Sequence, residues 1–303
     1  MGTPEFAVPI LEGLIENCNV LLVVSQPDKE KDRKGNLLPT PVKKLATSNN
    51  IPVFQPEKVR NNYEEILSYN PDIIVTCAYG QIIPKQLLDY PKYGCINVHA
   101  SLLPKLRGGA PIHRAIMNGD DKTGITIMYM DEKMDNGDII SQEELPILDI
   151  DNLDTMYEKL SFMGKELLLK TLPNIISNNI KRIKQDENLV TYGYNISREE
   201  EKIDFNNKSL VIYNKIRSLS SKPGAYCYLD GKRLKIYKTL LTDSLCHEKP
   251  GTIEKVDKNG IYVSTMDYLI IIKELKVEGK NRCDVRQFLN GKNILELKGK
   301  ILE

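Results

Sequence analysis

Short apolar runs alternate with amphipathic, helix-like segments along the first half of the chain. Runs rich in Val and Ile, bounded by turn residues, predict strands at residues 19–25, 72–77, 95–99 and 125–130. Apolar positions recur at helical spacing over residues 4–16, 41–48, 62–69 and 111–118, and a longer helix is predicted at residues 154–172. Strands that alternate with helices are typical of an α/β fold. We therefore predict an N-terminal domain with a doubly wound, Rossmann-like, mostly parallel sheet and helices on both faces.

The pattern changes after a polar stretch at residues 178–197, which we interpret as a linker. A helix is predicted at residues 204–219; strand-like runs follow at residues 225–229, 233–238, 251–256, 261–265 and 268–276, with a brief helix near residues 284–289. The turns Asp230-Gly231 and Asn259-Gly260 are strong hairpin signals. This order predicts a smaller C-terminal OB-like β-barrel domain. The predicted domains are residues 1–177 and 198–303.

Composition excludes several classes of protein. The 303 residues are 41% hydrophobic and 27% charged, with 42 Lys+Arg against 41 Asp+Glu, which excludes a disordered polymer, a collagen-like repeat and a supercharged nucleic-acid binder. The charge is unevenly divided, because residues 197–303 hold 21 basic and 15 acidic side chains (+6), which leaves 21 and 26 (−5) before them. A basic C-terminal domain fits either a polyanion-binding appendage or an ordinary lysine-rich solvated surface.

The chain carries no signal for a membrane, for export or for a metal. No apolar run approaches the ~18 residues that a membrane helix needs, and the first ten residues lack a basic start and a long apolar stretch. We therefore expect a cytoplasmic protein. Six scattered cysteines without a C-x-x-C pair are expected to be reduced, and with only three histidines we expect no metal site.

The richest candidate chemistry follows the predicted strand 95–99. Asn97 and His99 are two residues apart, so a strand would point both side chains to one face. An amide N–H can stabilise an oxyanion and an imidazole can move a proton, which suits acyl transfer. Asp135, in the run MDNGD after the next strand, could hold or charge-stabilise His99, although on pattern alone it could also be a turn former and His99 a packed residue. A Cys95–His99 nucleophile pair is disfavoured, since residues four apart on a strand are too distant for a direct hydrogen bond.

The run INVHASLLPKLRGGAPI at residues 96–112 resembles the signature of folate-dependent formyltransferases. The segments MGTPEFAVPIL, SQPDK, PTPVKKLA and CAYGQIIP, and the later segments ISREEEKIDF, PGAYCYLDGKRLKIYK, PGTI and RQFLNGK, are similar to the members of this family that act on methionyl-tRNA. The likeness covers nearly the full length, with the motifs in the same order.

The resemblance implies a reaction and its residues. The chain would transfer a formyl group from 10-formyltetrahydrofolate to the α-amino group of methionyl initiator tRNA for translation initiation, as a monomer and without a metal. The family's catalytic Asn, His and Asp align with Asn97, His99 and Asp135. Its folate-contacting residues align with Ser101, Leu102, Leu103, Pro104, Tyr79, Gly80, Gln81, Ile82 and Ile83. A basic loop that enters the tRNA acceptor stem aligns with Arg33 and Lys34.

One departure and two rival functions follow from the same comparison. Family members usually begin with a short apolar strand before MGTPEFAVP, and since that strand would lie inside the sheet, we expect its loss to be costly. The rival enzyme is a folate-dependent formyltransferase that acts on a nucleotide-sugar amine or on phosphoribosylglycinamide. The rival of another class is a non-catalytic RNA-binding relative, against which the intact Asn97, His99 and Asp135 argue.

Overall fold

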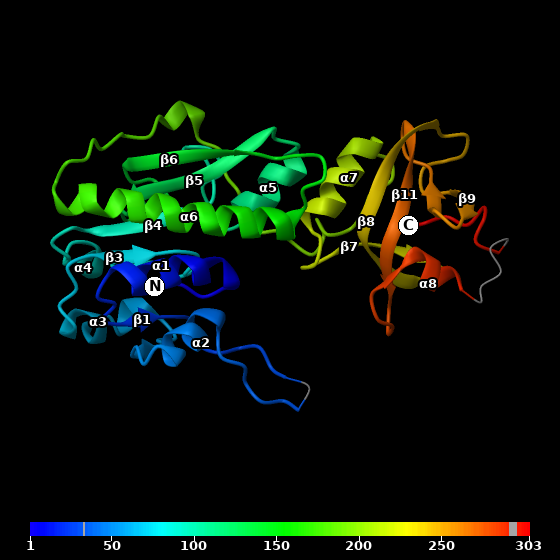
Figure 1. Cartoon of the computed structure of the whole chain (residues 1–303). Helices are drawn as coiled ribbons and strands as arrows, with labels where there is room; N and C mark the ends of the chain where they lie inside the picture. The colour runs from blue at the N-terminus through cyan, green and yellow to red at the C-terminus, as the bar shows by residue number, and fades with distance from the viewer. Residues whose placement is uncertain (33, 291–295) are drawn as a thin grey trace. The chain divides into compact units, whose positions relative to one another are not determined.

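The computed structural model describes residues 1–32, 34–290 and 296–303 and divides into two compact units (Figure 1). Unit 1 comprises Met1–Pro111, Lys122–Pro146 and Tyr157–Tyr194, and unit 2 comprises Ile112–Asp121, Ile147–Met156 and Asn195–Glu303. Each unit is therefore assembled from segments that are separated along the chain. The predicted domain boundaries at residues 177 and 198 stay a prediction.

Unit 1 contains a four-stranded sheet of order β3-β4-β5-β6, formed by β3 (Ile74–Thr76), β4 (Cys95–His99), β5 (Lys122–Tyr129) and β6 (Ile139–Pro146). β3 and β4 are parallel, whereas the β4–β5 and β5–β6 pairs are antiparallel. The sheet is thus mixed where the sequence predicted a mostly parallel one. The β5–β6 connection covers only residues 130–138, too few for the crossover that parallel strands need. β6 was not predicted from the sequence because it is largely polar.

A smaller parallel pair, β1 (Val23–Val24) and β2 (Val53–Phe54), completes the strands of unit 1. The first two residues connect this pair to the larger sheet, because the Gly2 N–H donates to the Val24 carbonyl and the Cys77 N–H donates to the Met1 carbonyl. A pocket of about 540 Å³ adjoins them; its lining includes residues 18–24, residues 71–75 and apolar side chains of α1 (Val8–Asn17) and α6 (Leu153–Ile176).

One helix of unit 1 begins at a signal that the sequence contains. α2 (Pro41–Ser48) starts with a proline at its first position, and the Thr40 hydroxyl accepts a hydrogen bond from the Lys43 N–H at 3.3 Å. α6 passes close to β4, since a Cβ on Gly164 would lie 3.1 Å from Val98. The shorter helices are η1 (Glu5–Ala7), η2 (Val59–Asn61), α3 (Glu64–Ser68), α4 (Lys85–Leu88) and η3 (Glu187–Leu189).

Unit 2 is built on an antiparallel sheet of order β7-β8-β11-β10-β9, with β12 paired to β11. Its turn Asp230-Gly231 has φ of 51° and 72° at the two central residues, which confirms the hairpin signal. Buried Ile, Leu, Val and Phe side chains from strands and helices form one core. The elements are α5 (Pro111–Asn118), α7 (Ser209–Ser218), β7 (Ala225–Leu229), β8 (Lys232–Leu245), β9 (Ile253–Asp257), β10 (Gly260–Val263), β11 (Tyr268–Val277), β12 (Cys283–Asp284) and α8 (Val285–Leu289).

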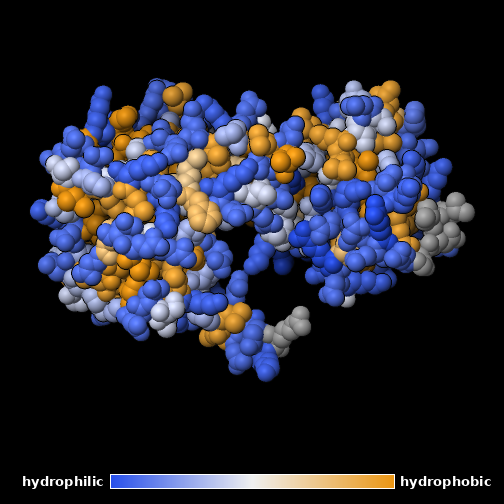
Figure 2. All heavy atoms as spheres, in the orientation of Figure 1, coloured by the Kyte–Doolittle hydropathy of each residue, from blue (hydrophilic) through white to orange (hydrophobic). Residues whose placement is uncertain are grey.

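The surface visible in Figure 2 is mostly hydrophilic, with apolar residues in scattered patches. Among the residues that the structure describes, none of the helices has both the length and the apolar character required to span a membrane.

Candidate active site

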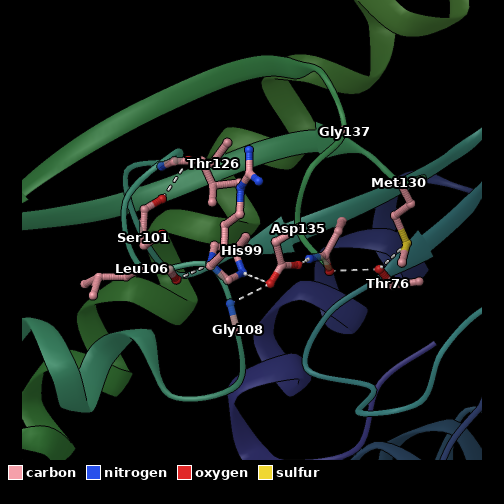
Figure 3. A network of polar contacts seen from close by, with 12 residues as sticks. Thr76, His99, Ser101, Leu106, Gly108, Thr126, Met130, Asp135 and Gly137 are labelled. Carbon is pink, nitrogen blue, oxygen red and sulfur yellow. Dashed lines mark hydrogen bonds and ion pairs between the residues drawn. The ribbon is translucent and has the colours of Figure 1, made fainter. Parts of the chain in front are cut away.

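The candidate site lies where β3 and β4 end. The parallel register places Thr76 opposite Asn97, and the Thr76 hydroxyl lies 2.8 Å from Asn97 Oδ1 (Figure 3). This contact orients the carboxamide, because the hydroxyl can donate only to the amide oxygen. Asn97 Nδ2 then faces Asp135 Oδ1 at 3.5 Å. The amide therefore directs its N–H groups into the site.

His99 is nearly enclosed at the end of β4, with only 6% of its surface exposed. Its Nε2 donates to the Leu106 carbonyl at 3.0 Å, since a carbonyl oxygen can only accept. Its Nδ1 lies 3.7 Å from Asp135 Oδ2. The imidazole is thus held between a backbone carbonyl on one side and a carboxylate on the other, as Figure 3 shows.

Asp135 lies on the loop between β5 and β6, in the left-handed backbone region with φ of 49°. Aspartate tolerates this conformation better than most side chains. Its Oδ2 accepts a hydrogen bond of 2.8 Å from the Gly108 N–H. The structure therefore brings Asn97, His99 and Asp135 together, as the sequence predicted, although their catalytic role stays a prediction.

The predicted folate residues after β4 form a firmly bonded turn. The Ser101 hydroxyl donates to the Lys105 carbonyl at 2.6 Å, and Leu103 is buried. Two residues that the sequence analysis missed complete the turn. The Thr126 hydroxyl donates to the Ser101 carbonyl at 2.6 Å, and Gln142 Nε2 donates to the Leu103 carbonyl at 2.9 Å. Leu102 and Pro104 are half-buried in the same turn.

The predicted folate loop at residues 79–83 follows β3, so it leaves the same edge of the sheet as Asn97. Tyr79 and Ile83 are buried, whereas Ile82 is 78% exposed. Gly80 has φ of 78°, and the Gln81 side chain is held by the Val59 N–H at 2.8 Å. Burial raises the pKa of Tyr79 to about 12, and its hydroxyl has no hydrogen-bond partner among the described residues.

The predicted tRNA loop is a small hairpin in which the Leu38 N–H donates to the Glu30 carbonyl and Lys31 pairs with Leu37. Figure 1 shows it extending from the chain just before α2. Lys34 is exposed, and its backbone N–H donates to the Asp32 carboxylate at 2.8 Å. Arg33 lies outside the described residues.

Part of the segment predicted as a linker contacts the site. The Thr191 hydroxyl accepts a hydrogen bond of 2.9 Å from the Leu106 N–H, and the Gly193 N–H donates to the Arg107 carbonyl at 2.7 Å. Residues 185–193 therefore support the loop that receives the His99 hydrogen bond. Their polar composition resembles that of a solvated linker, so the sequence contained no signal for this contact.

No group of His, Cys, Asp and Glu side chains suited to holding a metal ion is found within residues 1–32, 34–290 and 296–303.

Comparison with known proteins places the chain in a family. The Formyl transferase family model matches residues 1–172, and the model of the Formyl transferase C-terminal domain matches residues 195–293. A methionyl-tRNA formyltransferase of Bacillus velezensis is 51% identical over 298 residues, which are 97% of this chain and 94% of that protein. That of Bacillus subtilis is 50% identical with the same coverage.

A solved structure shows the same fold at lower identity. The sugar 3N-formyl transferase WlaRD, crystallised in the presence of dTDP and 5-N-formyl-THF, superposes with a TM-score of 0.66 at 24% identity, over 92% of this chain and 97% of that one. At this identity the likeness concerns the fold alone. The identity to the two bacillar proteins over nearly the whole length is what decides the family, and the chain belongs to the methionyl-tRNA formyltransferases.

Proposed function

We propose that this chain transfers the formyl group of 10-formyltetrahydrofolate to the α-amino group of methionyl initiator tRNA, and that Asn97, His99 and Asp135 carry the reaction. Formylation of methionyl-tRNA for translation initiation is the activity of the family to which the chain belongs. The observation that carries the assignment of residues is the cluster itself, with the Asp135 carboxylate within 3.7 Å of His99 and 3.5 Å of Asn97.

Asn97 is the donor for the oxygen that gains negative charge. A neutral aminoacyl amine attacks the formyl carbon; because such amines have a pKa near or below about 7.7, a sizeable neutral fraction exists at physiological pH. As the new C–N bond forms, the formyl oxygen becomes anionic. Thr76 fixes the amide oxygen of Asn97, which leaves the Nδ2 hydrogen that does not face Asp135 to stabilise this charge.

His99 and Asp135 serve the protons of the reaction. The attacking amine must lose a proton and the folate nitrogen must gain one when its bond to the formyl carbon breaks. Nδ1 of the His99 imidazole is suited to taking up the first proton and returning one, because Nε2 already donates to the Leu106 carbonyl. Asp135 orients the ring, since its Oδ2 faces Nδ1 while the Leu106 carbonyl holds Nε2.

The residues around the site fit a folate, which would supply the formyl group. The exposed Ile82 offers an apolar surface, and Tyr79 lies buried in the same loop. The turn formed by Ser101, Leu102, Leu103 and Pro104 is rigid enough to hold a ligand, because its backbone is bonded to Thr126. We propose that these residues, with Gly80, Gln81 and Ile83, bind the donor.

We propose that residues 198–303 form an OB-like domain that binds the tRNA. We also propose that the two parallel strand pairs of unit 1, β1–β2 and β3–β4, form the Rossmann-like part of the N-terminal domain. Tyr226 and Tyr228 alternate with buried residues on β7, and face Lys235 and Arg233 on β8. The Arg233 guanidinium lies 3.8 Å from the centroid of the Tyr226 ring. Alternating aromatic and basic side chains are typical of nucleic-acid surfaces. The exposed Lys34, with Arg33, would give a second contact.

The tRNA contact can be tested through its salt dependence. Replacing Arg233 and Lys235 by Gln should flatten the log–log salt dependence of tRNA binding by about 0.7–0.9 for each phosphate that the variant no longer neutralises. Lys258→Gln, in the turn between β9 and β10, is the matched control and should keep the slope. An unchanged slope in the double variant would show that this face does not contact the tRNA backbone.

The reaction is tested by a formylation assay with methionyl initiator tRNA, run beside a nucleotide-sugar amine and phosphoribosylglycinamide. Wild type should formylate only the tRNA, and His99→Ala should abolish the transfer while folding and folate binding remain. His247→Ala, at an exposed histidine of unit 2, is the control. Preferred transfer to either small amine would refute the proposed substrate, and full activity of His99→Ala would remove His99 from the mechanism.

The reaction would take place in the cytoplasm, where tRNA is charged.

A further inference from the structure

We infer that Gln185 is a positioning residue that holds the Asp135 loop in its reactive geometry. The inference rests on the proposed role of Asp135. Gln185 lies in the polar segment predicted as a linker, yet its side chain is buried in unit 1. It contacts neither Asn97 nor His99, so any effect on the reaction passes through its neighbours.

The hydrogen bonds of Gln185 use both ends of its amide. Nε2 donates to the Asp135 carbonyl at 2.9 Å and to the Gly137 carbonyl at 2.8 Å. Oε1 accepts from Arg107 Nε at 3.0 Å. Two donors and one acceptor on the same terminal group are a property of the carboxamide, which no charged or apolar side chain of this length shares.

The loop that Gln185 holds is one that needs support. Asp135 adopts a left-handed backbone with φ of 49°, a conformation that is unfavourable for a non-glycine residue. At Gly137 the backbone passes so close to Tyr129 that a Cβ would overlap the Tyr129 carbonyl oxygen. By bonding the carbonyls on both sides of this turn, the Gln185 amide fixes the direction in which the Asp135 carboxylate points.

The second partner, Arg107, connects Gln185 to the opposite side of the site. Its neighbours hold the catalytic side chains, because the Leu106 carbonyl binds His99 Nε2 and the Gly108 N–H binds Asp135 Oδ2. The Arg107 side chain is buried and also pairs with Glu187, which is 66% exposed, at 2.9 Å. One amide thus sets the distance between the Asp135 loop and the backbone that holds His99.

The test replaces the amide while keeping its size. Gln185→Met keeps most of the volume without donors, and Gln185→Glu keeps the shape but places a carboxylate against two carbonyl oxygens. Since misplacing a reacting group by about 1 Å can cost about 100-fold, we expect kcat to fall about 10- to 100-fold in both variants. KM for the folate and for the tRNA should stay within about twofold, because binding in the ground state is unchanged.

A matched control and a second background separate positioning from general stability. Glu187→Gln removes the exposed ion pair of the same Arg107 and should keep the wild-type kcat. In an Asp135→Asn background, Gln185→Met should lower the residual kcat by less than about threefold, since coupled residues are not additive. Circular dichroism and thermal unfolding show which variants are folded. If Gln185→Met is not folded, Gln185→Glu takes its place in both backgrounds.

Three results would overturn the inference. A folded Gln185 variant with wild-type kcat, or a Gln185→Met loss that is equally large with Asn at position 135, would show that the amide does not act through Asp135. Full activity of Asp135→Asn alone would refute the proposed role of Asp135 and this inference with it. Because only this last outcome is measured on Asp135→Asn alone, failure of the proposed role of Asp135 can be distinguished from failure of the role of Gln185.

Discussion

Asn97→Asp is the substitution with the most sharply defined consequence. Asn97 Nδ2 lies 3.5 Å from Asp135 Oδ1, so an aspartate in the same rotamer would place two carboxylates against each other. Asn97→Ala is the matched control, because it removes the same donor without adding a charge. Thr76 keeps an alternative acceptor in both variants, the Ile96 carbonyl at 3.2 Å.

The size of the effect follows from the distance. Two unit charges 3.5 Å apart repel by about 5 kcal/mol at an effective dielectric constant of about 20. The pair can avoid this cost by binding a proton, which at pH 7 requires raising one carboxyl pKa from about 3.9 to 7 and costs about 4 kcal/mol. The smaller cost prevails. Asn97→Asp should therefore be up to about 4 kcal/mol less stable than Asn97→Ala at pH 7.

The sign of the pH dependence distinguishes this cause from a packing defect. A carboxyl whose pKa is raised in the folded state is relieved by acid, so the deficit of Asn97→Asp should shrink to about 1.5 kcal/mol at pH 5. Urea unfolding of both variants at the two pH values measures it. Both should also lose about 100- to 1,000-fold in kcat, since both lack the donor. Equal stability of the two variants at pH 7 would refute the placement of Asp135 against residue 97.

Three further predictions concern stability. Tyr79→Phe should stabilise the ligand-free protein by about 1 kcal/mol in urea unfolding, because it removes a buried hydroxyl that has no partner among the described residues; a loss of stability would contradict this. Burial, and secondarily Arg114, lowers the pKa of His113 to about 4. Stability should then fall by at most about 3 kcal/mol as the pH drops from 6.5 to 4, and His113→Gln should lack this loss in denaturation at pH 7 and 4.5. The hydrogen bond from Arg114 lowers the pKa of Glu200 to about 2, so its stabilisation should be present above pH 4.5 and vanish towards pH 2. With Glu200 39% exposed, Glu200→Gln should cost no more than about 1 kcal/mol at pH 7 in the same assay.

Local patterns predicted the elements that depend on local geometry. The helix at residues 41–48 and the strand at residues 95–99 have the predicted bounds, because a capping threonine and a bounded apolar run act within a few residues. The placement of Asn97 and His99 on one face followed from the same strand geometry. β6 was missed because it is an edge strand whose residues are largely polar and give no apolar run.

The arrangement around the site depends on contacts that no local pattern records. Gln185 bonds to a carbonyl 50 residues earlier and to a guanidinium 78 residues earlier. Side-chain bonds to backbone carbonyls require no particular residue type in the partner, so the partner leaves no trace in the sequence. A polar run such as IKQDEN has the composition of a solvated linker whether or not it is docked.

Residues 185–193, which contact the loops around the site, also explain how the site keeps its shape with few catalytic side chains. Asn97 and His99 are fixed by the strand that carries them, but Asp135 comes from a loop whose backbone is unfavourable on its own. The loop therefore needs an outside support, and a buried amide that bonds both its carbonyls supplies one at the cost of ordering a single side chain. Substitutions that remove the side-chain hydrogen bonds of Gln185 or Thr191 should consequently lower turnover more than substitutions at exposed positions such as Glu187.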